Sequence, residues 1–199
     1  MLDPWDIKYG AAFDVLDPAR FQQLLDTIGS REVGLIWLAP PCWSHSAAQN
    51  GRRGGPLRSA RVPEGIDPQH PVTKLGNALW AAAVHLFEHA LEHNVLAAIE
   101  HPVTAYSWRT ASAQRLMNRP GVKLIKRDMC NFQSVADLRT KKPTGILTNQ
   151  PWIQDLPIKC DKTHSHAPHL CGSAAKAAAA YSFGFAQALA QAHGRWKTQ

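Results

Sequence analysis

Four short apolar runs along the chain predict β-strands. The first two, residues 33–39 (VGLIWLA) and 95–100 (VLAAIE), are almost wholly apolar and contain β-branched residues. Such runs are typical of strands that are buried on both faces. Two further runs, residues 122–126 (VKLIK) and 145–149 (GILTN), predict a third and a fourth strand.

The segments between these runs have the pattern of helices. Asp17 is a predicted N-cap, Pro18 occupies the first helical position, and the helix ends near Gly29. A longer helix is predicted where leucines recur among many alanines, and a short helix and a last long helix follow it. These three predicted helices span residues 72–93, 112–117 and 173–193.

Helices that alternate with buried strands predict an α/β fold with a mostly parallel sheet covered on both faces. The 199 residues suit a single domain with a sizeable core, so we expect residues 1–199 to form one domain. Residues 47–71 contain Gly, Pro and Arg with little periodicity and predict a long basic loop. A loop of this length inside a compact domain is usually functional or disordered.

The composition and the N-terminal sequence indicate which kinds of binding partner and which cellular compartment to expect. The chain has 22 Lys and Arg against 15 Asp and Glu, which favours an anionic partner such as nucleic acid, although many basic proteins bind none. The N-terminal sequence MLDPWDIKYG is polar and unlike a signal peptide. No apolar run approaches ~18 residues, so we expect no membrane span and an intracellular location, with the nucleus as one candidate compartment. The oligomeric state is left open.

Two reactive side chains follow the first two predicted strands. Cys42 comes directly after Pro40 and Pro41, and Glu100 ends the second apolar run. Ligands of parallel sheets bind beyond the carboxyl ends of the strands, so we expect the two side chains to lie at the same edge. The simpler alternatives are a buried structural thiol for Cys42 and a cap or surface charge for Glu100.

These residues resemble the DNA (cytosine-5) methyltransferases. That family places a Pro-Cys nucleophile after a strand and a Ser four residues beyond the Cys, matched here by Pro41, Cys42 and Ser46. A Glu ends the family's next strand, matched by Glu100, although His101 stands where the family usually has Asn. The order of these features fits over roughly residues 5–190, and the local sequences resemble divergent eukaryotic methylase-like domains, some of them carried by mobile elements.

The resemblance extends to a hairpin with basic residues. Residues 130–133 (CNFQ) and 138–149 (LRTKKPTGILTN) resemble the family's hairpin that supports the target base, with Arg139, Lys141 and Lys142 as candidates. The resemblance therefore implies a Rossmann-like methyltransferase fold with an antiparallel hairpin near the C-terminal end. It also implies transfer of a methyl group from S-adenosylmethionine to C5 of cytosine in DNA, with RNA as the alternative substrate.

The implied reaction assigns a role to each candidate residue. The Cys42 thiolate adds to C6 of cytosine, which makes C5 nucleophilic, and Glu100 acts as the acid at N3. Arg139 completes the implied catalytic set, and the base is extruded from the duplex to reach the pocket. The residues expected to contact nucleic acid are Ser46, Arg52, Arg53, Arg58, Lys141 and Lys142.

The family binds S-adenosylmethionine through a Gly-rich turn after its first strand. This sequence begins at a segment that resembles the one just after that turn, so we expect a methyltransferase domain truncated at its N-terminus. The implied donor-binding residues are Asp6 at the ribose, Asp14 at the adenine, and Pro41. We expect weak donor binding, and activity of the isolated chain is left open.

A second cluster predicts a metal site. Cys160, His164, His166 and Cys171 fall within twelve residues, and Cys130 is a further candidate. Thiolate and imidazole groups are the ligands of structural zinc, although the spacing matches no common zinc finger. The alternative is a polar loop in which these residue types occur by chance.

Two other functional classes remain as rivals. Residues 85–89 (HLFEH) match the H-x-x-E-H pattern of inverted zinc peptidases, but they lie on the polar face of an amphipathic helix, which needs no metal. The second rival is a module that binds nucleic acid or a protein partner on a methylase-like fold without catalysis. Only the enzyme requires a reactive thiolate at Cys42, so that residue separates the two interpretations.

Overall fold

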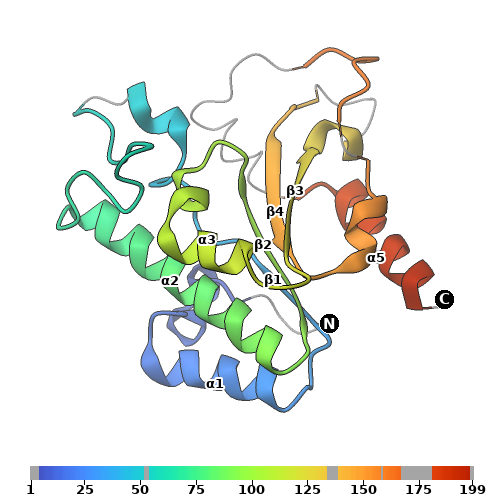
Figure 1. Cartoon of the computed structure of the whole chain (residues 1–199), viewed down its shortest axis with the longest axis horizontal. Coiled ribbons are helices and arrows are strands. Elements are labelled where there is room, and N and C mark those ends of the chain that lie inside the picture. The colour runs from blue at the N-terminus through green and yellow to red at the C-terminus, as the bar shows by residue number, and fades with distance from the viewer. Residues whose placement is uncertain (1–4, 52–53, 134–138, 158, 167–180, 198–199) are drawn as a thin grey trace.

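All four predicted strands are present in the computed structural model, which describes residues 5–51, 54–133, 139–157, 159–166 and 181–197. They are β1 (Leu35–Leu38), β2 (Leu96–Pro102), β3 (Lys123–Asp128) and β4 (Pro143–Thr148). Together they form one sheet in the order β1-β2-β4-β3 (Figure 1). The α/β class is therefore confirmed.

The sheet is mixed rather than mostly parallel. β1 and β2 pair in parallel, whereas β4 pairs antiparallel with both β2 and β3. The prediction of a mostly parallel sheet is wrong for the described strands. An antiparallel pair is present, but β4 pairs with β3, whereas residues 130–133, predicted as the first half of the hairpin, lie in or directly after the 3₁₀ helix η5 (Met129–Phe132). The connections explain the difference: a long helix carries the chain back from β1 to β2, while β3 leads into β4 without a described crossover helix.

Helices cover both faces of the sheet (Figure 1). α1 (Pro18–Gly29), α2 (Pro71–Glu92) and α3 (Ala111–Met117) lie on one face, and α5 (Phe183–Lys197) lies on the other. The strands alternate accordingly: Ala97 and Ile99 join the core under α1–α3, while Ala98 joins the core under α5. This two-sided burial is the reason that the strands read as apolar runs.

Side chains cap the starts of the three helices on the first face. The Asp17 carboxylate accepts a hydrogen bond from the backbone N–H of Arg20, and the Thr110 hydroxyl accepts one from Ala113. His70 does the same at the start of α2 through a hydrogen bond from Val72. Each cap satisfies a backbone donor that the helix leaves unpaired.

Short 3₁₀ helices fill several of the connections. They are η1 (Ile7–Tyr9), η2 (Ala11–Phe13), η3 (Ala47–Gly51), η4 (Tyr106–Arg109), η5 (Met129–Phe132) and η6 (Pro151–Asp155). Among the described residues, no helix combines the length and apolar character that crossing a membrane requires.

Candidate functional site

The carboxyl ends of β1 and β2 lie side by side, as the sequence predicts. Leu38 at the end of β1 is opposite Ile99, and Glu100 is the next residue of β2. Cys42 follows β1 by four residues and is half-buried, and the Glu100 carboxylate influences its pKa. Cys42 and Glu100 therefore belong to one site at the same end of the sheet.

Glu100 is held by two polar neighbours. The Tyr181 hydroxyl donates a hydrogen bond to Glu100 Oε2 at 3.2 Å and accepts one from Trp37 Nε1 at 2.8 Å. Lys142 Nζ lies 3.6 Å from Glu100 Oε1, within ion-pair range. Glu100 is only 8% exposed, and its Oε1 has no hydrogen-bond donor among the described residues. This buried oxygen could accept a hydrogen bond from a ligand.

Both charges of the Glu100–Lys142 ion pair affect the pKa of the Cys42 thiol. Burial raises its pKa above the usual value, the Glu100 carboxylate raises it further, and the Lys142 ammonium opposes both effects. The thiolate is the reactive form of cysteine, so Lys142 is the group that favours reactivity.

Lys142 takes the place that the sequence interpretation gave to Arg139. The Arg139 guanidinium lies instead beside His164, with Nη1 2.9 Å from the ring Nδ1. The catalytic assignment of Arg139 is therefore not supported, whereas Lys142, expected to contact nucleic acid, contacts Glu100. Lys142 has a positive φ of 30°, which an apolar pattern does not reveal.

Arg58 is a buried structural residue and not a phosphate contact. The side chain is 1% exposed, and its guanidinium donates to Ser44 O and Oγ, Pro63 O, Thr73 O and Asn77 Oδ1 at 2.7–3.2 Å. All five N–H groups are used inside the protein. The prediction that Arg58 contacts nucleic acid is therefore wrong in this conformation, because no donor remains for a phosphate.

The other predicted nucleic-acid contacts lie near the site or outside the described residues. Ser46 is half-buried, its N–H donates to Cys42 O at 2.9 Å, and its Oγ accepts from Ala48 N at 3.3 Å. Lys141 is exposed. Arg52 and Arg53 are outside the described residues.

The residues predicted to bind the methyl donor have local structural roles. Asp6 Oδ1 accepts from Lys8 N at 3.0 Å, and Asp14 Oδ1 accepts from Leu16 N at 2.9 Å. Both are turns in which a carboxylate caps a backbone N–H two residues ahead. The backbone N–H of Lys8 lowers the pKa of Asp6. Pro41 is exposed beside Cys42.

His101 fixes the turn that carries Cys42, a role that the sequence did not indicate. The ring is fully buried, with Nε2 2.9 Å from Pro40 O and Nδ1 2.7 Å from Ser107 Oγ. Because Pro40 O can only accept, Nε2 donates and Nδ1 accepts from the Ser107 hydroxyl. Burial lowers the pKa of His101 to about 4, so the ring is neutral at pH 7.

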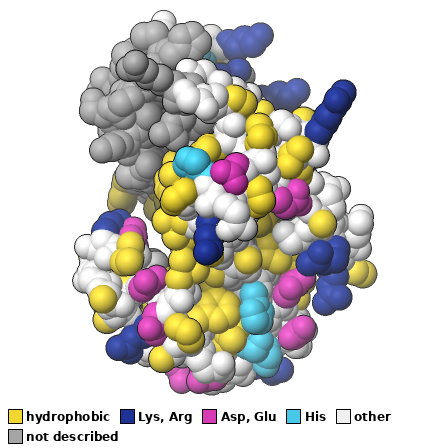
Figure 2. Space-filling model, turned by 90° about the vertical axis from the view of Figure 1, so that its left-hand side faces the viewer, with side chains coloured by type: hydrophobic (Ala, Val, Ile, Leu, Met, Phe, Trp, Pro, Cys, Tyr) yellow, Lys and Arg dark blue, Asp and Glu magenta, His cyan; other side chains and the backbone are white. Residues whose placement is uncertain are grey.

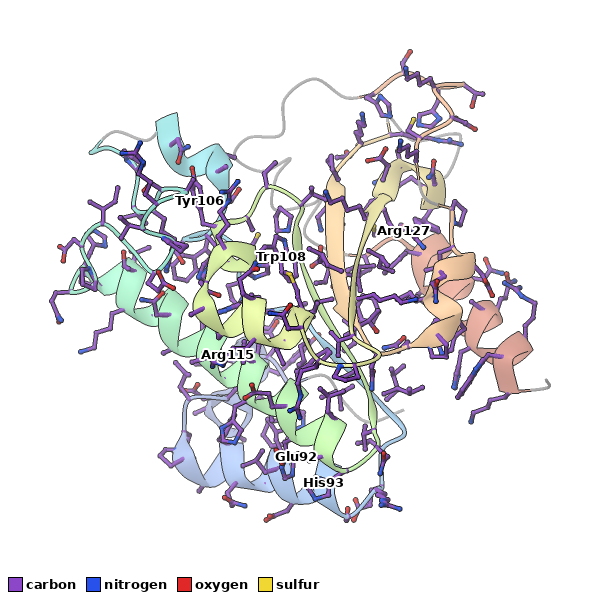
Figure 3. The ribbon with its side chains drawn as sticks, in the orientation of Figure 1. Glu92, His93, Tyr106, Trp108, Arg115 and Arg127 are labelled. Atoms are coloured by element: carbon purple, nitrogen blue, oxygen red, sulfur yellow. The ribbon has the colours of Figure 1, made fainter. Side chains whose placement is uncertain are left out.

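A second buried histidine packs against the first. The His45 and His101 ring centroids are 5.6 Å apart, and both rings contact Trp80. Burial lowers the pKa of His45 to about 3, and its Nε2 has no hydrogen-bond partner among the described residues. Figure 3 shows the neighbouring Trp108 between α3 and the sheet, with Arg127 on the far side of the sheet. The turn after β1 therefore rests on a packed layer of aromatic and imidazole rings.

Three of the four predicted metal ligands, together with the further candidate Cys130, lie close together. Donor atoms of Cys130, Cys160, His164 and His166 all lie within 4.8 Å of one another. Cys171 lies outside the described residues. Within the described residues, the chain therefore brings two sulfurs and two imidazoles together.

Another His- and Glu-containing group lies at the C-terminal end of α2, where Figure 3 labels Glu92 and His93. His89 Nε2 is 3.0 Å from Leu25 O, and His93 Nδ1 is 2.9 Å from His89 O. Both rings therefore bond to backbone carbonyls: His89 ties α2 to α1, and His93 caps the end of α2 itself. The His85 ring packs against Phe21 in a tilted arrangement, with the ring centroids 5.2 Å apart, which gives the peptidase hypothesis no support.

Two surface cavities lie away from Cys42. One of about 480 Å³ lies at the opposite end of the sheet, between Asn94, Gly121 and Asn149. The other, of about 670 Å³, lies between η5 and the start of α5, lined by Asn131, Phe132 and Phe183 among others. Neither includes Cys42 or Glu100. The chemistry of the side chains, and not cavity size, therefore identifies the site.

The basic excess does not form a single positive surface on the face that Figure 2 displays. Lys and Arg side chains are interspersed there with Asp and Glu. The net charge of +7 therefore gives little guidance on where an anionic partner would bind.

No family model, curated protein or solved structure matches the chain.

Proposed function

We propose that the chain is a DNA cytosine-5 methyltransferase-like domain in which Cys42 forms a covalent adduct with the target base. One observation carries the proposal: a thiol, a buried carboxylate and an ammonium group meet at adjacent strand ends. These are the groups that addition to a cytosine ring requires. The proposal depends on the residues and their chemistry, because no related protein supports it.

The reaction balances as one addition, one substitution at the methyl carbon and one elimination. The Cys42 thiolate forms a bond to C6, and the electron pair of the C5–C6 double bond makes C5 a nucleophile. C5 then takes the methyl group from the sulfonium of S-adenosylmethionine, whose carbon–sulfur bond breaks. Loss of the C5 proton to a base and departure of Cys42 restore the double bond and release the thiolate.

Glu100 suits recognition of the base at N3. Its Oε1 is buried, has no hydrogen bond from the described residues and lies 3.6 Å from Lys142 Nζ. The carboxyl can pair with N3 and the exocyclic amine of cytosine, and can supply the proton that N3 needs as sulfur adds. Lys142 then compensates the negative charge that remains on the Glu100 carboxylate. This role depends on where the ammonium group lies and not on the angles of its hydrogen bonds.

The mixed sheet is compatible with a Rossmann-like methyltransferase fold. The parallel pair β1–β2 and the antiparallel hairpin β3–β4 occur in the order that the resemblance implies. Donor binding would rest on Asp6 and Asp14, whose carboxylates already cap backbone N–H groups. We therefore expect weak binding of S-adenosylmethionine, with a dissociation constant well above the low micromolar range in titration calorimetry. A low micromolar value would contradict this expectation.

A donor-independent adduct tests the proposal. A DNA oligonucleotide that carries 2-pyrimidinone lacks the 4-amino group, so its C6 accepts a thiolate without a methyl donor. We expect a denaturant-resistant adduct with the native chain, none with Cys42→Ala, and slower formation with Glu100→Gln. Cys171→Ser is the matched cysteine control and should form the adduct normally. An adduct that persists in Cys42→Ala would refute the assignment.

The second candidate is a binding module without catalysis. The raised pKa of Cys42 favours it, because a protonated thiol adds poorly to a base. Such a module binds DNA or RNA equally well with Cys42 or with alanine at this position, and forms no adduct. Fluorescence anisotropy with labelled DNA and RNA duplexes and single strands, together with the adduct assay, separates the two functions.

A further inference from the structure

We propose that Cys130, Cys160, His164 and His166 form a structural zinc site that clamps the β3–β4 end of the sheet to the loop after η6. The site is independent of methyl transfer and of the Cys42 chemistry. It also replaces the ligand set suggested by sequence spacing, because Cys130 lies 30 residues before Cys160 along the chain.

The spacing of the donor atoms fits one tetrahedral ion. Cys160 Sγ lies 3.6 Å from His164 Nε2 and 3.4 Å from His166 Nε2. With Zn–S bonds of about 2.3 Å and Zn–N bonds of about 2.0 Å, two such ligands of a tetrahedral zinc stand about 3.5 Å apart. All four donor atoms lie within 4.8 Å of one another, which is compatible with the same tetrahedral geometry.

Both histidines direct the same nitrogen at the sulfur. This arrangement favours a metal site over a pair of thiols placed to form a disulfide, because a disulfide does not require two imidazole rings beside the sulfurs. Both Cys130 and Cys160 are free thiols in the structure. Four protein ligands leave no open position for a substrate, which is the property of a structural and not a catalytic zinc.

Groups around the ligands orient them. The backbone N–H of Lys162 donates to Cys160 Sγ at 3.3 Å, from a turn in which Lys162 has a φ of 64°. The Asp128 carboxylate accepts from Cys160 N at 3.0 Å. N–H donors to sulfur and carboxylates beside the ligand loop are typical supports of metal sites.

His164 has two neighbours at its other nitrogen. Asp161 Oδ1 lies 3.6 Å from His164 Nδ1, and Arg139 Nη1 lies 2.9 Å from it. Zinc at Nε2 leaves the hydrogen of the neutral ring on Nδ1, which then donates to Asp161. Metal binding therefore requires Arg139 to turn to a different acceptor, a local change that accompanies loading of the site.

The clamp reaches the backbone that carries Lys142. Cys130 is in η5, and the N–H of the preceding Met129 lies 3.0 Å from Lys141 O and 3.3 Å from Lys142 O. On the other side of the cluster, His166 forms a β-bridge with Arg139. The ion thus joins two stretches of chain, η5 and residues 160–166, and the β-bridge to Arg139 connects them to the segment that carries Lys142.

Metal analysis of the full chain, purified under reducing conditions without added metal, tests the site. We expect about one equivalent of zinc, and X-ray absorption should give two sulfur and two nitrogen ligands at the distances stated above. Less than about a tenth of an equivalent, with no uptake when zinc is supplied to the reduced protein, would overturn the proposal. A first shell with any other composition would overturn it as well.

Variants identify the ligands. Cys130→Ser and His164→Gln should each lower the zinc content at least tenfold, while Cys171→Ser and the exposed control His85→Gln should retain it. Because Cys130 is fully buried, its variant can fail to fold. In that case, cobalt substitution of the native chain identifies the cysteine ligands. The thiolate-to-cobalt absorption must correspond to two sulfurs, and it must be unchanged in Cys171→Ser. Loss of zinc in Cys171→Ser would refute the assignment of Cys130.

Discussion

Replacing Arg58 by methionine should destabilise the protein, because it removes the buried hydrogen bonds that hold the loop between β1 and α2. The guanidinium is the common partner of Ser44, Pro63, Thr73 and Asn77, which lie on both sides of the loop and on α2. Burial lowers the pKa of Arg58 to about 10, so the group remains charged at pH 7. The substitution keeps most of the side-chain volume and removes all five donors.

The expected loss of stability follows from two opposing effects. Five acceptors lose a buried donor, and at about 1 kcal/mol each, the low end of the usual range, this costs about 5 kcal/mol. Removing the buried charge relieves its desolvation, which the pKa change from 12.5 to about 10 puts at about 3 kcal/mol. The net loss is therefore at least about 2 kcal/mol, and it is larger if water cannot reach the acceptors that Arg58 leaves unpaired.

Urea unfolding followed by tryptophan fluorescence measures this loss, with Arg61→Met as the matched control. Arg61 is an exposed residue of the same loop, and its substitution should change the free energy of unfolding by less than about 0.5 kcal/mol. Equal, small effects of the two substitutions would refute the structural role. An unchanged stability of Arg58→Met combined with a loss of DNA affinity would restore the phosphate-contact interpretation.

Three further predictions follow from the site. Glu100→Gln should lower the pKa of Cys42, and Lys142→Met should raise it, as measured by mass spectrometry from the pH dependence of Cys42 alkylation. Equal pH profiles for the native chain and both variants would show that neither charge acts on the thiol. The pKa values of His45 and His101 fall on folding, so stability should be complete above about pH 6.5 and decline toward pH 4, by up to about 3 kcal/mol per histidine; urea midpoints that stay constant over this range would contradict it. Gly76→Ala should destabilise by about 1–3 kcal/mol although alanine favours helices, because the new methyl group overlaps Ser44 Oγ; a stabilised variant in thermal unfolding would contradict the close packing.

The strands were predictable because burial on both faces leaves an apolar run that few other elements share. The position of β2 agrees with its sequence prediction to within two residues at each end. The direction of β4 was not predictable from the same signal, because hydrophobic periodicity is identical in parallel and antiparallel strands. Only the connection between β3 and β4 distinguishes them.

The site was predictable in part. Cys42 and Glu100 could be paired because each follows a strand, and parallel neighbours bring such ends together. Lys142 could not be chosen over Arg139, because the choice depends on a positive φ in the hairpin. The burial of Arg58 left no signal in the sequence, since arginine is normally exposed.

The metal ligands illustrate the same limit. The segment from Cys160 to His166 has a recognisable density of donors, so three ligands were predictable from local sequence. The fourth donor, Cys130, could be named from the sequence only as a further candidate, because it follows β3 and reaches the cluster through the sheet and η5. Tertiary proximity of this kind cannot be derived from spacing along the chain.

The central claim is that Cys42 is the nucleophile of a base-modifying site, and peptide mapping of the 2-pyrimidinone adduct tests it most directly. After nuclease and protease digestion, mass spectrometry should find the nucleotide remnant on the peptide that contains Cys42. The yield should fall in Lys142→Met, because the ammonium that favours the thiolate is lost. A remnant on Cys130, Cys160 or Cys171, or no remnant on any cysteine, would contradict the account.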